Sequence, residues 1–485
     1  MSEVVNNTSI ISNIVLLVVV DAKYIKLAKN SFWTLIGNTG SKVLGFLLLP
    51  LYTRWLGTAG FGESDLVTTY ASFLVCIMTM CVSDAIFVFT KNEGQARKKV
   101  YFSTSFFFIL GVLLLWFLIW GCLDVGFSFF SIKNSFVNNL WLIYGIVATS
   151  FFQQYSQQFI LSLEKIKLYS FTGIIHTILT FCFSFWLIPA IGVRGYILSL
   201  IYSNLFTAAY SFCFSKSFSY LSLRSIDCQK VCEVLKFSIP LIPNGIMWWL
   251  VSALNRPVME YNLDYSSIGI YAVASRFPSV IMMVFAVFSV SWNISVFEEY
   301  GKDSYEDFYK KTFRLLFFVI VITSSAFMLS SELIVTIFAA PEFHEAWNYM
   351  VILIIGSVFS CLSSFFGTHF SVVKQSKYFF YSSVWGAITA IILNLLFIPS
   401  LGLWGASISM TMSFAVMMIS RYIYGMKFVS VSLLKYVLMY AVVLILMALT
   451  TLFCDNIFLK YLLSIVLISL FIIIERNVLK PILRL

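Results

Sequence analysis

The sequence is short of charge and of polar stretches. Only 11% of its 485 residues are Asp, Glu, Lys or Arg, whereas a soluble domain carries about a quarter. The longest breaks between apolar runs, residues 216–233 and 298–311, are too short to fold alone. With 60% hydrophobic residues, this composition excludes a soluble globular protein and indicates a polytopic membrane protein.

Cysteine and histidine are also scarce. The nine cysteines are scattered, mostly within apolar runs and without C-x-x-C spacing, and there are three histidines. Structural disulfides and metal sites need recurring Cys or His ligands at short spacings. The sequence therefore predicts no disulfide, no metal site and no cofactor.

Long apolar runs are what the sequence has instead. About 20 apolar residues span a bilayer as a helix, and we find fourteen such runs in the sequence, at residues 29–54, 65–90, 99–121, 136–162, 169–191, 195–215, 235–260, 267–296, 312–338, 348–373, 378–400, 403–426, 433–453 and 458–474. Residues 1–23 hold a shorter apolar stretch and are interpreted as an N-terminal extension. The prediction is an all-α integral membrane protein with about 14 transmembrane helices.

Lys and Arg are distributed unevenly between the two sides of the predicted spans. With a cytoplasmic N-terminus, 25 of the 32 basic residues fall on the inner side and five on the outer side. Cytoplasmic loops favour Lys and Arg, so both termini are predicted to be cytoplasmic. Anionic membrane lipid accounts for the net charge of +10, and nucleic acid is not an expected partner.

An internal repeat organises the chain. The segment LIPAIGVRG at residues 187–195 recurs as FIPSLGLWG at 397–405, a shift of 210, and Gly62 matches Gly269 at a shift of 207. Six spans separate the copies, so both have the same orientation, as in transporters with parallel repeats. We predict two pseudo-symmetric six-helix lobes plus two C-terminal helices, divided as 1–23 extension, 24–216 N-lobe, 217–233 cytoplasmic linker, 234–427 C-lobe and 428–485 final spans and tail.

Several segments resemble a known family. These are SFWTLIGNTGSKVLGFLLLPLYTRWLG at residues 31–57 with FGESDL after it, LKFSIPLIPNGIMWW at 235–249, IGIYAVASRF at 268–277, and the two IP-x-x-G-x-x-G corners. Together they are similar to polysaccharide-lipid flippases of the MOP (multidrug/oligosaccharidyl-lipid/polysaccharide) exporter superfamily, and most to the O-antigen (Wzx-type) branch. The resemblance covers nearly the whole chain from residue 24.

The resemblance implies a transporter and not an enzyme. Its cargo would be an oligosaccharide linked to undecaprenyl pyrophosphate, moved between leaflets of the bacterial inner membrane by alternating access of two lobes. Coupling to H⁺ or Na⁺ is proposed for such proteins, and polysaccharide polymerase machinery is a further expected partner. No ATP site is implied, in keeping with the absence of a Walker A run from the sequence.

Lys42 is the first candidate site residue. It lies about thirteen residues from either end of the first predicted span and shares a helical face with Asn38. Burying a lysine at this depth costs at least about 2.5–3.5 kcal/mol, so such residues face a bundle interior or a wet cavity. A lysine would suit the pyrophosphate of the cargo, and the alternative is snorkelling to a headgroup. The repeat matches Lys42 with Trp249, which predicts an aromatic face opposite the charge.

Arg276 is the second intramembrane cation. Its helical face carries small and polar residues, including Gly269 and Ala272, which indicates an interior position. Arginine suits bidentate phosphate contact, and the alternative is a structural ion pair. Arg54 and Arg256, near the outer ends of their spans, are predicted either to contact phosphate at the exit side or to anchor their helices.

Asp84 is the clearest acidic residue inside a predicted span. It is predicted to pair with Lys42, to serve as a protonatable coupling site, or both, since a pair broken by protonation is itself a switch. The segment FFQQYSQQF includes Gln154 and Gln158, which would either contact sugar or bond neighbouring helices. His176 is interpreted as a packed histidine.

Two other functions remain open at this stage. One is a drug or metabolite extruder of the same superfamily, which would need an acidic cavity. The other is a membrane glycan polymerase or ligase, which would need catalytic residues in a sizeable outer loop.

Overall fold

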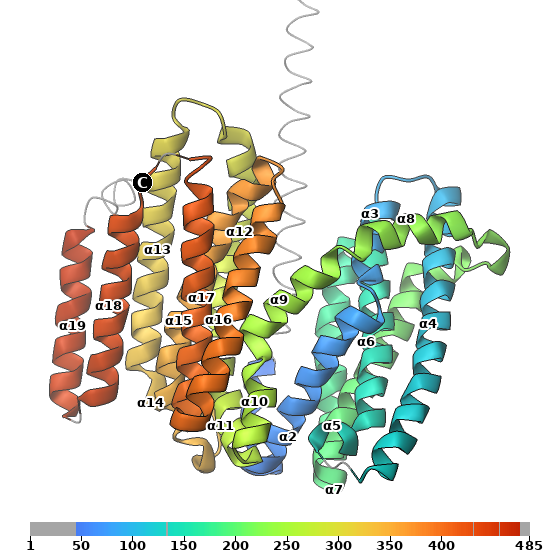
Figure 1. Cartoon of the computed structure of the whole chain (residues 1–485), viewed down its shortest axis with the longest axis horizontal. Coiled ribbons are helices and arrows are strands. Elements are labelled where there is room, and N and C mark those ends of the chain that lie inside the picture. The colour runs from blue at the N-terminus through green and yellow to red at the C-terminus, as the bar shows by residue number, and fades with distance from the viewer. Residues whose placement is uncertain (1–44, 132–133, 430, 455, 476–485) are drawn as a thin grey trace, which may run out of the picture.

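The computed structural model describes residues 45–131, 134–429, 431–454 and 456–475. Within these ranges every regular element is a helix (Figure 1). The prediction of an all-α membrane protein is confirmed.

The α-helices follow one another with short connections. Their bounds are α2 Leu49–Met78, α3 Val82–Thr90, α4 Gln95–Phe129, α5 Ser135–Asn138, α6 Leu140–Ser162, α7 Ile166–Ser215, α8 Cys228–Ser238, α9 Leu241–Ala253, α10 Asn255–Asn262, α11 Tyr265–Arg276, α12 Ser279–Glu299, α13 Tyr305–Leu329, α14 Ser331–Phe338, α15 Ala346–Val372, α16 Lys377–Leu401, α17 Leu403–Gly425, α18 Leu434–Phe453 and α19 Ile457–Ile474. Three short 3₁₀ helices complete the set: η1 Ser217–Tyr220, η2 Leu223–Ser225 and η3 Pro341–Phe343.

Ten helical segments of the described chain are long and apolar enough to cross a membrane, or eleven if α2 and α3, bent by 51° at their junction, form one span. The 50-residue helix α7 covers two of the predicted spans, 169–191 and 195–215, and its backbone leaves the helical conformation at Gly192. The first predicted span, 29–54, lies mostly outside the described residues. The number fourteen therefore stays a prediction.

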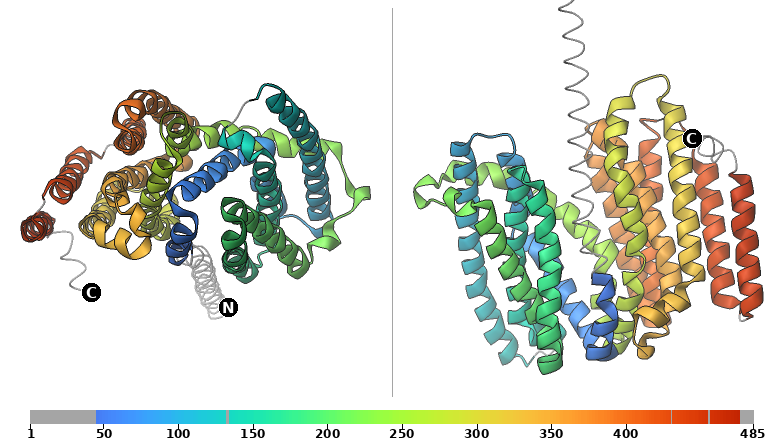
Figure 2. Two further views of the ribbon diagram at one scale, coloured as in Figure 1. Left: turned by 90° about the horizontal axis from the view of Figure 1, so that it is seen from below. Right: turned by 180° about the vertical axis from the view of Figure 1, so that it is seen from behind.

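The helices gather in two groups with α2 and α9 running between them (Figure 1). Helices α3 to α8 form one group and α11 to α19 the other, with α18 and α19 at its far edge (Figure 2). Helix α8 packs on α3 and α4, and Val234 joins the apolar core of the first group. The predicted boundary at residues 233/234 thus falls inside α8, and the lobe limits stay a prediction.

The two corners identified from the sequence have the same backbone conformation. Gly192 has φ 58° and ψ −131°, and Gly402 has φ 57° and ψ −128°. This left-handed region is costly for residues with a Cβ atom. Three residues on, a Cβ at Gly195 or Gly405 would lie about 2 Å from the carbonyl oxygen of Leu187 or Phe397. The repeat is therefore present in the backbone as well as in the sequence.

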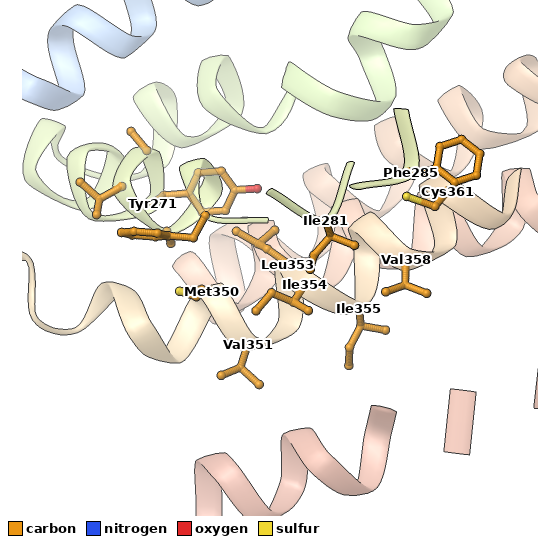
Figure 3. Close-up of a cluster of buried hydrophobic side chains, with 14 of the residues drawn as sticks. Tyr271, Ile281, Phe285, Met350, Val351, Leu353, Ile354, Ile355, Val358 and Cys361 are labelled. Atoms are coloured by element: carbon orange, nitrogen blue, oxygen red, sulfur yellow. The ribbon is translucent and has the colours of Figure 1, made fainter. Parts of the chain in front are cut away.

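The largest apolar core surrounds α15, whose apolar stretch is 83% buried inside the protein. Figure 3 shows Ile281 of α12 beside Leu353 and Ile354, and Phe285 beside Cys361. Such interdigitated side chains hold α11, α12 and α15 together by close packing. This rigid group supplies one wall of the candidate site.

Candidate functional site

A cavity of about 670 Å³ lies between the two helix groups. We call it the charged cavity. Its wall combines α2 and α7 with α9, α10, α11 and α12, and its charged lining residues are Asp65, Arg256 and Arg276. Hydroxyl groups from both sides complete the wall: Tyr52, Thr68, Thr69, Ser72, Thr177, Thr180, Tyr196, Ser252, Ser275 and Ser279.

Asp65 of α2 is the acidic centre of this cavity. Its side chain is 9% exposed, and its Oδ2 accepts a hydrogen bond from Nε of Arg256 at 2.9 Å. Its Oδ1 lies 3.6 Å from Nη2 of Arg276. An ion pair between α2 and the helices α10 and α11 therefore lies on the cavity wall, where a charge without a partner would be strongly destabilising.

Four of the five N–H donors of Arg256 bond to protein groups, the Nε donor to Asp65. Its Nη1 donates to the carbonyl oxygen of Ser252 and to Oδ1 of Asn255, both at 3.0 Å, and its Nη2 donates to Oγ of Ser275 at 3.0 Å. The guanidinium also lies over the Tyr271 ring, 5.2 Å from its centroid. This arrangement fits the anchoring interpretation of Arg256, because the one N–H donor that remains cannot make a bidentate contact with a phosphate.

Arg276 differs from Arg256 in exposure and in pairing. Its side chain is 48% exposed, and its 3.6 Å distance to Asp65 exceeds the usual 2.7–3.2 Å of a hydrogen bond. Its guanidinium, which also interacts with the Tyr196 hydroxyl, is therefore accessible to an anionic group in the cavity. Arg276 is the cation of this site best placed to bind a ligand.

A second cavity of about 700 Å³ adjoins the first. The two share Thr68, Ser72, His176 and Leu200 in their walls. Asp84 and Gln154 line this second cavity, and among the described residues no ion pair to Asp84 is formed. His176 is hydrogen-bonded to Oδ1 of Asn204 at 2.9 Å, so this histidine lines the cavities and is not fully packed away.

The structure brings only some of the predicted residues to these cavities. Lys42 and Asn38 lie outside the described residues. Trp249 does not present an aromatic face to either cavity, because its Nε1 donates at 3.2 Å to the Thr69 carbonyl and the Ser72 hydroxyl and so packs α9 against α2.

Arg54 and Gln158 are also absent from both cavity walls. Arg54 is exposed on α2, just before the bend at Gly57. Their role in the cavity stays a prediction, because helical periodicity does not tell which polar face meets the other half of the protein.

Asp65 was missed by sequence reasoning, which treated Asp84 as the only clear intramembrane acid. Asp65 stands at the first position of the predicted span 65–90, so the sequence did not single it out as an acid inside a span. The repeat held the missing signal: at a shift of 207, Arg276 corresponds to Thr69, one helical turn beyond Asp65. Two close-packed repeat helices then place this acid and this cation at similar depth.

Comparisons with known proteins agree with the fold and the site. The described helices, a charged cavity between two helix groups and the repeated corners define a transporter architecture. The chain belongs to the polysaccharide biosynthesis protein family, whose sequence model matches residues 27–292, and it falls within the MOP superfamily as predicted. A second family model, MatE, matches residues 241–396.

A curated relative, Lsg locus putative protein 1 of Haemophilus influenzae, is 24% identical over 266 residues. The match covers 53% of this chain and 62% of the relative, so the chain spans less than two thirds of the relative's length.

Solved structures share the fold. The lipid II flippase MurJ in an inward closed conformation has a TM-score of 0.68 at 15% identity, covering 92% of this chain and 99% of MurJ. An inward-facing multidrug resistance MATE transporter of the MOP superfamily has a TM-score of 0.59 at 14% identity, covering 79% and 94%. These neighbours are transport proteins and not enzymes, which agrees with the prediction of a transporter.

Proposed function

We propose that this protein is a flippase that moves a lipid-linked oligosaccharide from the cytoplasmic to the outer leaflet of a bacterial inner membrane. Membership of the polysaccharide biosynthesis family supports the substrate class. The carrier would be undecaprenyl pyrophosphate, and the glycan an O-antigen or similar polysaccharide repeat unit. Both termini would be cytoplasmic, as the distribution of Lys and Arg predicts.

The observation that carries this proposal is the state of Arg276. A half-exposed guanidinium, loosely paired with Asp65 in a cavity between two helix groups, suits the pyrophosphate of a lipid carrier. The phosphate would replace Asp65 as the partner of Arg276, while Asp65 would keep its 2.9 Å hydrogen bond to Arg256. The two adjoining cavities, at about 670 and 700 Å³, fall in the size range of ligand sites.

Cargo binding would then favour alternating access because it changes the charge balance across the interface. Anionic cargo would weaken the link between Asp65 on α2, which runs between the two groups, and Arg276 on α11 of the second group. Lys42 would add a second cation, and Asp84 in the second cavity would serve as a site for H⁺ or Na⁺ coupling. A ligand shifts such an equilibrium only by its different affinity for the two states.

The test is a gene deletion with complementation. Loss of the protein should trap lipid-linked saccharide on the cytoplasmic leaflet and remove surface glycan. Arg276→Ala and Lys42→Ala should fail to restore export at normal membrane abundance, and Arg276→Lys should restore it in part because it keeps the charge. Full complementation by both alanine variants would refute the cationic-site proposal.

A multidrug or metabolite extruder is the second candidate, supported by the MatE match at residues 241–396. The acids Asp65 and Asp84 would then bind cationic compounds. A rise in drug susceptibility on deletion, with surface glycan unchanged, would favour this function over the flippase.

A further inference from the structure

A third, smaller cavity lies away from the charged cavity. It measures about 450 Å³ and is lined by Glu63, Asn138, Asn139, Ile191, Val193 and Arg194. We call it the outer cavity. It lies where α2, the α5–α6 junction and the Gly192 corner of α7 meet, at the end of the first helix group opposite the α3–α4 turn (Figure 1). Lys91 lies in that turn, and Arg97 and Lys98 follow in the first turn of α4. This positive charge places the outer cavity on the predicted outer side.

The polar groups of the outer cavity are held in place by hydrogen bonds, but some of their donors and acceptors have no partner among the described residues. Asn139 is 4% exposed, and its Nδ2 donates to Oε1 of Glu63 at 2.9 Å and to the Ser135 carbonyl at 3.1 Å. Within the described part of the chain, Oδ1 of Asn139 and Oε2 of Glu63 accept no hydrogen bond. Arg194 is exposed, and no described carboxylate lies within 4.0 Å of it. The cavity therefore offers acceptors from Glu63 and Asn139 and donors from Arg194 to a polar ligand.

The second half of the repeat shows that the fold does not require this space. The shift of 210 that relates Gly192 to Gly402 also relates the left-handed residues Glu164 and Lys374, with φ 57° and 54°. It matches Asn139 with Tyr349 and Arg194 with Trp404. The rings of Tyr349 and Trp404 pack edge to face with centroids 5.0 Å apart. One half of the protein thus fills with aromatic rings the place that the other half leaves open and polar.

We infer that the outer cavity is a saccharide subsite that receives the glycan of the cargo on the side where the cargo leaves. A carboxylate, a guanidinium and two amides provide the mixed donors and acceptors that sugar hydroxyls need. Its volume lies at the lower end of the range for ligand sites, which suits a small sugar unit. The role as an exit subsite rests on the proposed function, whereas sugar binding itself does not.

The first experiment measures binding directly. Saturation-transfer difference NMR on the purified full-length chain in detergent micelles would use glucose, N-acetylglucosamine and glucuronate as probes. At least one probe should show saturation transfer to the wild type and lose it in Asn139→Tyr/Arg194→Trp, which copies the second half. Arg224→Trp, the same substitution at an exposed site in η2, should retain it.

The second experiment separates the subsite from the flippase function. In cells, the Asn139→Tyr/Arg194→Trp variant should lower surface glycan and raise lipid-linked intermediates, whereas Arg194→Lys should stay near wild type.

If deletion of the gene leaves surface glycan intact, the proposed function fails while the NMR result still decides sugar binding. If deletion removes glycan but the filled-cavity variant exports normally and keeps any NMR signal of the wild type, the subsite is refuted. Absence of saturation transfer to wild type from all three probes also refutes it. The single variant Arg194→Trp keeps the Asn139–Glu63 hydrogen bond, so it controls for misfolding of the double variant. It should also lose sugar binding.

Discussion

Gly62 of α2 and Gly269 of α11, equivalent positions of the repeat, pack directly against each other. A Cβ atom on Gly62 would lie 2.0 Å from the carbonyl oxygen of Tyr265, and one on Gly269 would lie 2.0 Å from that of Thr58. The two helices therefore cross with backbone in contact, as small residues allow in membrane helices. Because the matched residues of both halves meet here, this crossing brings the Asp65 and Arg276 helices together at the charged cavity.

The first prediction concerns this crossing. Gly62→Ala should destabilise the protein by about 1–3 kcal/mol or more, because the new methyl group meets backbone that has no rotamer to yield. Thermal unfolding in detergent measures the effect. Gly121→Ala in α4, where a Cβ meets nothing within 4 Å, is the matched control and should be neutral or slightly stabilising. Equal stability of the two variants would contradict the observed crossing.

The second prediction separates the two arginines that face Asp65. Asp65→Ala leaves the buried Arg256 without its carboxylate and should lower stability by about 3–5 kcal/mol. Arg276→Ala removes a half-exposed, loosely paired cation and should cost about 1 kcal/mol or less. Unfolding curves and membrane abundance of both variants provide the measurement. A large stability loss in Arg276→Ala would show that Arg276 is structural and weaken its assignment to cargo.

The third prediction concerns Glu475 at the end of α19. Its side chain is 1% exposed, its Oε2 accepts a hydrogen bond from Nε of Arg314 in α13 at 3.1 Å, and its Oε1 accepts one from Tyr440 of α18 at 3.3 Å. Glu475→Ala should destabilise the attachment of α18 and α19 by about 3–5 kcal/mol, because it leaves a partly buried arginine unpaired. Limited proteolysis should then cleave near residues 426–433 faster than in Glu299→Ala, which removes only an exposed pair with Lys302. Equal cleavage rates would contradict this role.

The fourth prediction is a pH dependence at the start of α11. Asp264 caps this helix by accepting a hydrogen bond from the backbone N–H of Ser267 at 3.0 Å. The Ser267 side chain and backbone N–H hold the pKa of Asp264 below its ordinary value. A lowered pKa in the folded state stabilises the protein above the ordinary carboxyl pKa of about 4, and this contribution is lost as pH falls through the folded value.

Asp264→Ala should therefore lower stability by about 0.5–2 kcal/mol at neutral pH. The difference from wild type should shrink as pH falls below about 4. Thermal unfolding at several pH values gives the comparison, with Asp264→Asn as a cap that does not titrate. A wild-type advantage over Asp264→Ala that is constant across this range would refute the carboxylate as the cause.

Much of the fold could be predicted from composition and periodicity because the bilayer imposes them. A run of about 20 apolar residues crosses the bilayer as a helix, because a helix satisfies its own backbone hydrogen bonds in lipid. The corner glycines were visible for a similar reason, since Gly192 and Gly402 adopt a left-handed conformation that other residues rarely take. Arg276 was found because an ionised group within an apolar run needs a polar environment, whatever its partner.

Tertiary structure alone decided which side chains meet. Asp65 of α2 pairs with Arg256 of α10, 191 residues away. It also lies 3.6 Å from Arg276 of α11, the helix that crosses α2 at two glycines, and no local pattern encodes these approaches. The same holds for Trp249, whose indole bonds to α2 and lines neither the charged cavity nor the cavity beside it. The outer cavity exists because Asn139 and Arg194 leave open the space that Tyr349 and Trp404 fill in the other half. Hydrophobicity and backbone stereochemistry are properties of single segments and can be read along the chain, whereas ion pairing and cavity shape arise between segments and depend on how they pack.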